Sequence, residues 1–364
     1  MIRFERIPIH TTTAESEREA PYLDIMGEIE PIEFLFTQGD KYHYIARANL
    51  HTLKGEPKTG KSAAGLALIT AAIKGEYLGI KAMPDIKVLW IDTEQDKSTL
   101  CQKARAVLDM AGVDAVPENL KVVPLRGYGS PAECLADTIK KIEDNAPDFV
   151  FLDGIVDLCG GFNDEEKSRE AVGQLEAAAE HTGAAILCLI HTNGRKDDKA
   201  RGHLGTILQQ KSAEIYQIEK GQFHSDNVSK VVGKVIQPFS RFASVPGFAF
   251  AFEDDFKISD VSEAMKKAEQ KKKDEAEEEK REEFRSIFAA LFKNADKIRR
   301  KDLIKAYTEE CKCGDTTARN AIDYADAAHI LYKHETKGKK AYYSYLFPGF
   351  EDIKENDNKD DEDL

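Results

Sequence analysis

Residues Gly55-Glu56-Pro57-Lys58-Thr59-Gly60-Lys61-Ser62 spell the pattern G-x-x-x-x-G-K-S, which constrains the fold more than any other part of the chain. In such a loop the backbone N–H groups curl around a phosphate, and the positive end of the following helix points at the same anion. Lys61 is expected to reach the β- and γ-phosphates of a nucleotide, and Ser62 to hold Mg²⁺. The loop, extended by Ala63, therefore predicts a site for ATP and Mg²⁺.

The segments around this loop have the order that the motif requires. Residues 48–53 read as a strand and residues 63–74 as a helix. Continuous apolar runs then alternate with helical stretches; the runs are 88–92, 120–124, 149–153 and 185–191, and the helices are 98–111, 131–145 and 166–182. This alternation predicts an α/β fold with a mostly parallel central sheet whose strands are covered on both faces. Strand candidates at 212–219, 229–236 and 248–252 predict an antiparallel extension of that sheet.

Two carboxylates are candidates for the chemistry of phosphoryl transfer, which needs an acid that holds Mg²⁺ and a base that orients water. Asp153 ends the strand at 149–152 and is the predicted magnesium ligand beside Ser62. Because Gly154 follows it, the base must come from elsewhere. Glu94 follows the strand at 88–92, which is expected next to the strand of the phosphate loop, and is the predicted base. Asp92 and Asp157 are second choices, and the plain alternative for Glu94 is a neighbour of a helix cap.

A histidine and a basic loop follow the fourth apolar run. His191 ends that run and is expected to contact the γ-phosphate, the alternative being a strand-end histidine bonded to backbone. The loop at 194–202 has two open roles besides that of a solvated loop. Arg201 is predicted as an arginine finger on a neighbour's nucleotide. Arg195, Lys196 and Lys199 are predicted to contact nucleic-acid phosphates.

The C-terminal third divides into a charged helical linker (258–283), a mildly basic module (284–349) and an acidic tail (350–364). In the module, helices at 284–292, 300–307 and 315–328 precede a hairpin, which is the order of a winged helix. The alternative is a small helical dimerisation cap. A winged helix would place Thr316, Thr317, Arg319 and Asn320 on duplex DNA, and Lys337, Lys339 and Lys340 of the wing on its phosphates. The acidic tail is a candidate site for a protein partner.

The composition of the chain bears on its expected partners, its cellular location and the role of its cysteines. The net charge of −13 argues against a general nucleic-acid binder. The sequence has no run of 18 apolar residues and no evident signal peptide at its N-terminus, so a cytoplasmic protein that does not span a membrane is expected. Six scattered cysteines read as reduced core thiols. Cys311 and Cys313 form the one close pair, and zinc binding there would require His329 and His334.

Together these motifs resemble the RecA-like RepA family, which includes hexameric replicative helicases of plasmids and related ATPases of mobile elements. The resemblance covers about residues 30–255 and rests on the phosphate loop, Asp92-Thr93-Glu94, Asp153, His191-Thr192-Asn193 and Ala200-Arg201-Gly202. Asp157-Leu158 and Phe162-Asn163-Asp164 also match. It implies that Glu94 is the catalytic carboxylate, that His191 senses the γ-phosphate, and that Arg201 acts across a subunit interface of a homo-oligomer such as a hexamer. His203-Leu204-Gly205-Thr206 depart from the small residues that the family often has there.

The expected domains are a lead-in (1–30), a RecA-like P-loop ATPase (31–257), and the linker, winged helix and tail. The leading hypothesis is an ATP-hydrolysing motor that binds single-stranded DNA at its core and duplex DNA at its winged helix. A DNA-bound regulatory or loading ATPase that does not unwind DNA is the second hypothesis. A small-molecule kinase is the third.

Overall fold

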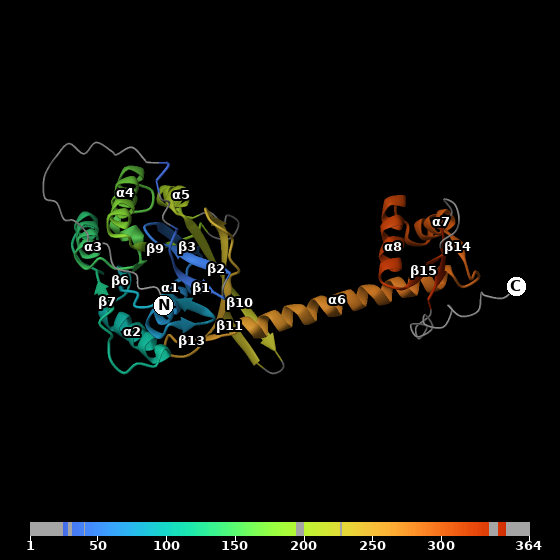
Figure 1. Ribbon diagram of the computed structural model, residues 1–364, viewed down its shortest axis with the longest axis horizontal. Helices are drawn as coiled ribbons and strands as arrows, with labels where there is room; N and C mark the ends of the chain where they lie inside the picture. Colours follow the sequence, from blue (N-terminus) through green and yellow to red (C-terminus); the bar gives the residue numbers. More distant parts are fainter. Residues whose placement is uncertain are drawn as a thin grey trace.

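The computed structural model describes residues 25–27, 31–39, 41–193, 200–225, 228–334 and 341–346. A large α/β domain is joined by one long helix to a small C-terminal module (Figure 1). Within the described residues, no helix is both long enough and apolar enough to cross a membrane.

The α/β domain is built on a nine-stranded sheet of the order β13-β12-β11-β10-β3-β9-β8-β6-β7, counted over the described residues. Six neighbouring strands from β10 to β7 are parallel, and β11, β12 and β13 are added by antiparallel pairing. The mostly parallel α/β fold with an antiparallel extension is therefore confirmed. The strands are β3 (Leu50–Gly55), β6 (Val88–Asp92), β7 (Leu120–Pro124), β8 (Phe149–Asp153), β9 (Ala185–His191), β10 (Glu214–Ser225), β11 (Val228–Ser240), β12 (Phe248–Phe252) and β13 (Ile258–Asp260).

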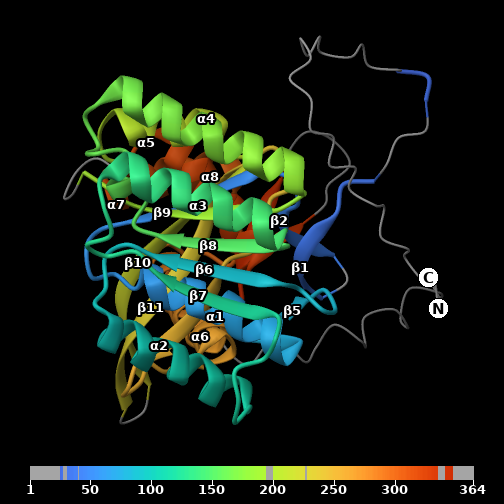
Figure 2. The ribbon, with the colours of Figure 1, turned by 90° about the vertical axis from the view of Figure 1, so that its left-hand side faces the viewer.

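Helices cover both faces of this sheet, and Figure 2 shows the layers edge on. One face packs on α1 (Lys61–Lys74) and α2 (Lys97–Ala111), with the fully buried Trp90 and Phe151 in the core between them. The other face packs on α3 (Pro131–Asn145), α4 (Glu165–Thr182) and α5 (Gly202–Lys211). The entry of α3 is fixed by a capping box in which Ser130 and Glu133 bond each other's backbone N–H groups.

A second, four-stranded sheet of described residues lies beside the first and was not expected from the sequence. Its strands run in the order β2-β1-β5-β4 and are β1 (Phe34–Gln38), β2 (Tyr42–Ala46), β4 (Glu76–Tyr77) and β5 (Ile80–Ala82). They form two short hairpins with polar residues at many positions, so they lack the continuous apolar runs of the central strands. Their buried residues, such as Phe36 and Ile80, join the same core as α1.

The C-terminal module has its own core of buried residues, including Phe288, Leu303, Ile322 and Tyr343. It follows α6 (Ser262–Leu291), whose last turns belong to that core, and contains α7 (Arg300–Cys311), α8 (Asp315–Ala327) and a small sheet of order β14-β16-β15. The strands of this sheet are β14 (Ile298–Arg299), β15 (Leu331–His334) and β16 (Tyr342–Tyr345).

Three details differ from expectation. The ATPase sheet continues past residue 257, because β13 pairs with β12 up to Asp260. The linker and the first helix of the module form one helix, α6, because no Gly or Pro interrupts residues 262–291. The strand before Glu94 is not a neighbour of the P-loop strand, since β9 and β8 lie between β3 and β6.

Candidate functional site

The P-loop connects β3 to α1, and the side chain of Lys61 lies folded over it. The ammonium group of Lys61 donates to the carbonyls of Gly55 (3.1 Å) and Glu56 (2.9 Å) and to Nδ1 of His191 (2.9 Å). These three contacts use all three ammonium hydrogens. Burial lowers the pKa of Lys61 to about 8, against the opposing effect of Asp153 and Glu94. A nucleotide phosphate would therefore replace contacts that the loop and His191 now make.

The P-loop packs closely against β12 at Gly60, which has no side chain. Gly60 has φ +103°, and a Cβ there would lie 2.4 Å from the ring of Phe252 on β12. Lys220 of β10 donates to the carbonyl of Lys58 at 3.4 Å, so the antiparallel extension supports the loop from this side. Any other residue at position 60 would force the loop away from Phe252.

Ser62 and Asp153 meet as a magnesium site requires. The Ser62 hydroxyl donates to Oδ2 of Asp153 at 2.6 Å, from the first turn of α1 to the end of β8. Hydroxyl and carboxylate oxygens suit Mg²⁺, which usually completes its shell with water and phosphate oxygens. No group of three or more His, Cys, Asp or Glu side chains is placed to hold a metal within the described residues. Ser62 and Asp153 have the oxygen ligands that would hold Mg²⁺ together with a nucleotide phosphate.

Glu94 is presented by a turn that Asp92 holds. Asp92 is fully buried, and its Oδ1 accepts the backbone N–H groups of Glu94 (3.0 Å) and Gln95 (2.8 Å). The hydroxyl of Thr93 lies within hydrogen-bond distance of two acceptors, Oδ2 of Asp157 (2.7 Å) and the carbonyl of Gly154 (2.8 Å), and connects the same turn to the segment after β8. Desolvation raises the pKa of Glu94, and the charges of Asp157 and Asp92 raise it further.

The packing around Gly154 explains why no side chain follows Asp153 directly. Gly154 has φ +107°, and a Cβ there would lie 2.0 Å from the Thr93 hydroxyl and 2.9 Å from Cγ of Glu94. The space that a side chain at position 154 would need is thus filled by Thr93 and Glu94.

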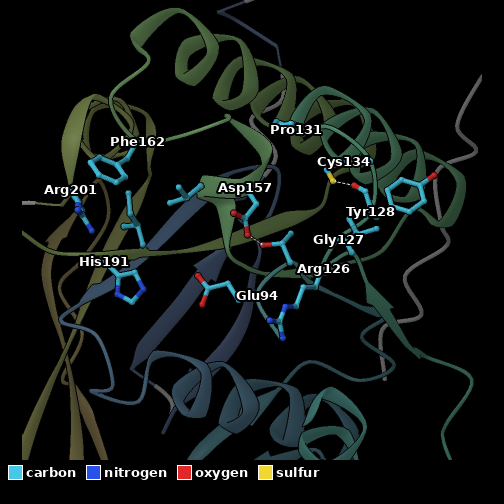
Figure 3. Close-up of a pocket in the computed structure, with 15 residues that line it drawn as sticks. Glu94, Arg126, Gly127, Tyr128, Pro131, Cys134, Asp157, Phe162, His191 and Arg201 are labelled. Atoms are coloured by element: carbon cyan, nitrogen blue, oxygen red, sulfur yellow. Dashed lines mark hydrogen bonds between the residues drawn. The ribbon is translucent and has the colours of Figure 1, made fainter. Parts of the chain in front are cut away.

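A cavity of about 620 Å³ opens beside Glu94 at the carboxyl ends of the parallel strands. Figure 3 shows Glu94 and His191 on one side of it and Arg126 and Tyr128 on another. Arg201 and Phe162 also line it, and the guanidinium carbon of Arg201 lies 3.9 Å from the centre of the Phe162 ring. From the sequence, Phe162 matches the RepA family but has no assigned role. Arg126 and Tyr128 belong to no sequence motif and were not predicted.

His191 connects the P-loop to the following loop. Besides its bond to Lys61, its carbonyl accepts the backbone N–H of Arg201 at 2.9 Å, and Thr192 forms a β-bridge with Ala200. The structure therefore brings Thr192 and Ala200 together beside His191. Burial lowers the pKa of His191, and the charges of Lys61 and Arg201 lower it further, so a neutral imidazole accepts the Lys61 proton.

The predicted residues Lys61, Ser62, Glu94, Asp153, His191 and Arg201 thus surround one region, and Asp92 and Asp157 support it. The predicted DNA-binding residues Arg195, Lys196, Lys199, Lys337, Lys339 and Lys340 lie outside the described residues, as does the acidic tail. Thr316, Thr317, Arg319 and Asn320 are exposed on the first half of α8. Cys311 and Cys313 pack partly buried against the core of the module.

Comparison with known proteins identifies the core. A family model described as an AAA domain matches residues 15–197, just over half of the 364-residue chain. The chain belongs to this family. The matched AAA domain contains the P-loop, Glu94, Asp153 and His191, so this is a P-loop ATPase that binds ATP. A comparison with curated proteins finds no match.

Proposed function

We propose that this AAA-domain protein is an oligomeric, ATP-hydrolysing motor of the RecA-like RepA type that acts on DNA in the replication of a plasmid or mobile element. The observation that carries the proposal is the contact between Lys61 and His191. It links Lys61, the expected phosphate-binding residue, to His191, whose carbonyl accepts the backbone N–H of Arg201 just beyond residues 194–199.

In the proposed reaction, Lys61 and the P-loop N–H groups bind the β- and γ-phosphates of ATP. Ser62 and Asp153 hold Mg²⁺, which when bound neutralises charge on the phosphate oxygens. Glu94 orients the attacking water from the cavity and accepts its proton, which its raised pKa favours. Arg201 stabilises the charge that develops on the γ-phosphate. Arg201 is exposed and lines the cavity of its own chain, so we propose that it acts there.

We propose that His191 couples ATP hydrolysis to DNA. When Lys61 turns to a phosphate it leaves His191, and the imidazole is then available to contact the γ-phosphate. Directly after His191, the β-bridge between Thr192 and Ala200 and the bond from Arg201 to the His191 carbonyl join the described residues on either side of 194–199. We propose that Arg195, Lys196 and Lys199 within this loop contact the phosphates of single-stranded DNA and respond to hydrolysis.

We propose further that the C-terminal module is a winged helix that binds duplex DNA through α8. Three helices and a three-stranded antiparallel sheet of described residues support this, in the order α6-β14-α7-α8-β15-β16. Arg319 is free of ion pairs within the described residues and lies next to the exposed Asn320. Arg300 contacts Asp323 at 2.6 Å, which offsets one acid on the helix that would face DNA.

One observation favours the alternative of a regulatory or loading ATPase that does not unwind DNA. The helix α8 carries Asp315, Asp323 and Asp326 against the single cation Arg319. This excess of negative charge weakens the electrostatic attraction of α8 to DNA, and it is equally compatible with a protein partner.

The deciding experiment measures steady-state ATP hydrolysis without DNA, with single-stranded DNA and with duplex DNA, and strand displacement in parallel. A motor hydrolyses ATP faster with single strands and displaces a strand. Stimulation by duplex alone, without displacement, would select the regulatory ATPase. Lys61→Ala is the control for hydrolysis by contaminating enzymes.

A further inference from the structure

A lysine lies in the buried stripe of α2. Leu100, Lys103 and Val107 are three and four residues apart, so they share one face of the helix, and Leu100 and Val107 pack in the core against the sheet. Lys103 is only 7% exposed. Lysine side chains are almost never this buried unless they are paired. Yet within the described part of the chain no hydrogen bond or ion pair to its ammonium group is found.

Lys103 interacts electrostatically with the carboxylates of the ATPase site. Its charge acts on Asp92 and Asp153, and also on Glu94, in each case favouring the ionised acid. Asp92 and Asp153 are direct partners on the adjacent strands β6 and β8, and both are buried. Two buried carboxylates side by side require a counter-charge. Lys61 supplies part of it from the P-loop, and Lys103 is the cation that comes from α2.

Asp92 has one oxygen in use and one without a partner. Its Oδ1 accepts the N–H groups of Glu94 and Gln95, while its buried Oδ2 has no hydrogen bond within the described residues. A buried carboxylate oxygen in this condition is costly. The unsatisfied oxygen thus belongs to a carboxylate on which the charge of Lys103 acts.

We propose that Lys103 is a positioning residue of the ATPase site: its ammonium group holds Asp92, and Asp92 holds the turn that presents Glu94. The link between Lys103 and Asp92 is either a bridging water or a direct contact made as the site closes. This role rests on the proposed function only in so far as Glu94 is the base. Lys103 itself touches neither the attacking water nor the phosphate in this arrangement.

Stability alone does not separate this role from a purely structural one. Removing one charge from a group of buried charges leaves the others uncompensated, so Lys103→Met is expected to lower the melting temperature in either case. The two roles differ in where the effect appears. A positioning role lowers kcat and loosens the turn at Glu94, whereas a packing role loosens α2.

The test compares Lys103→Met, Lys103→Arg and the control Lys97→Met, which removes an exposed charge from the same helix. For Lys103→Met we expect kcat to fall about 10- to 100-fold, with the KM for ATP changed less than about threefold. Lys103→Arg restores most of the rate. In the nucleotide-free protein, amide hydrogen exchange at Glu94 and Gln95 becomes faster in Lys103→Met, while exchange in α1 and α4 is unchanged.

An unchanged kcat in Lys103→Met, or faster exchange along α2 in place of the Glu94 turn, would overturn the proposal. If Lys103→Met does not fold, Lys103→Gln is measured in the same way and decides by the same outcomes. If the wild type hydrolyses no ATP, the proposed function fails, but the exchange experiment still decides whether Lys103 holds the turn.

Discussion

Arg201 packs its guanidinium group on the ring of Phe162 and faces the same cavity as Glu94 of its own chain. The resemblance implied that this arginine acts on the nucleotide of a neighbouring subunit. Its position beside His191, whose pKa it helps to lower, favours action within its own chain.

Mixing two inactive variants tests this placement. Arg201→Ala should lower kcat by about 10³-fold or more, because an arginine finger contributes at least that much. A mixture of Lys61→Ala chains with Arg201→Ala chains should then stay inactive, because neither chain has a complete site. Recovery of activity in the mixture would show that Arg201 acts across an interface. Arg169→Ala on α4, which removes another exposed arginine, is the matched control.

Glu94→Gln should bind ATP with nearly unchanged affinity and hydrolyse it about 100-fold more slowly or worse, because the amide cannot take the proton from water. Single-turnover hydrolysis and binding of a fluorescent ATP analogue measure the two properties. Normal turnover would move the base to another acid, and Asp157→Asn is the variant to compare. The turn that carries Glu94 should be intact in Glu94→Gln, because Asp92 bonds backbone N–H groups there.

The affinity for nucleotide should fall as the pH rises above about 8, the pKa of Lys61. Below that pH the ammonium group is charged in the free protein and binding is independent of its titration. Bound phosphates favour the charged form, so the pKa of Lys61 rises in the complex. Between the two pKa values, affinity decreases by up to about tenfold per pH unit. Titration of a non-hydrolysable analogue from neutral to alkaline pH measures this, and a flat profile would contradict it.

Gly154→Ala should destabilise the protein by about 1–3 kcal/mol and slow hydrolysis, because it requires a left-handed backbone and displaces Thr93. Chemical denaturation followed by circular dichroism measures the stability. Gly161→Ala provides the comparison, since Gly161 also has a positive φ (+137°) but no atom within 4 Å of the added Cβ. Equal losses in both variants would remove Thr93 from the explanation.

Arg319→Ala should weaken binding of the full-length protein to duplex DNA by about 1–3 kcal/mol if α8 enters the groove. Lys267→Ala removes an exposed charge from α6 and should leave binding unchanged. Fluorescence anisotropy at two salt concentrations separates a base contact from a phosphate contact. Unchanged affinity in Arg319→Ala would remove this helix from the DNA interface.

The central sheet, and the meeting of the candidate site residues at one edge of it, could be predicted because both depend on local signals. The strands that end at Asp92, Asp153 and His191 are continuous apolar runs, and the residues at their carboxyl ends meet at one edge of a parallel sheet. Their neighbours in the sheet do not follow from such signals. The strand of Glu94 was expected beside the P-loop strand, and only the tertiary fold shows β9 and β8 between them.

The supporting residues were missed for a related reason. Arg126 and Tyr128 lie in a loop without a motif, and only the fold brings that loop to the cavity. Lys103 did leave a signal, since a charged residue occupies a position between Leu100 and Val107 that the apolar periodicity assigns to the core. Its meaning depends on Asp92, a residue on another element, and so required the structure.

The length of α6 sets the rotational orientation of the C-terminal module as well as its distance from the α/β domain. The 30 residues of α6 span about 45 Å, and residues 271–276 are all exposed, between the ion pair of Glu269 with Lys234 and the hydrogen bond of Glu277 with Tyr324. Each residue added or removed there would rotate the C-terminal module by about 100° around the helix axis while moving it only about 1.5 Å. The direction in which α8 faces, relative to the cavity beside Glu94, is therefore encoded in the number of residues in α6 much more than in their identity.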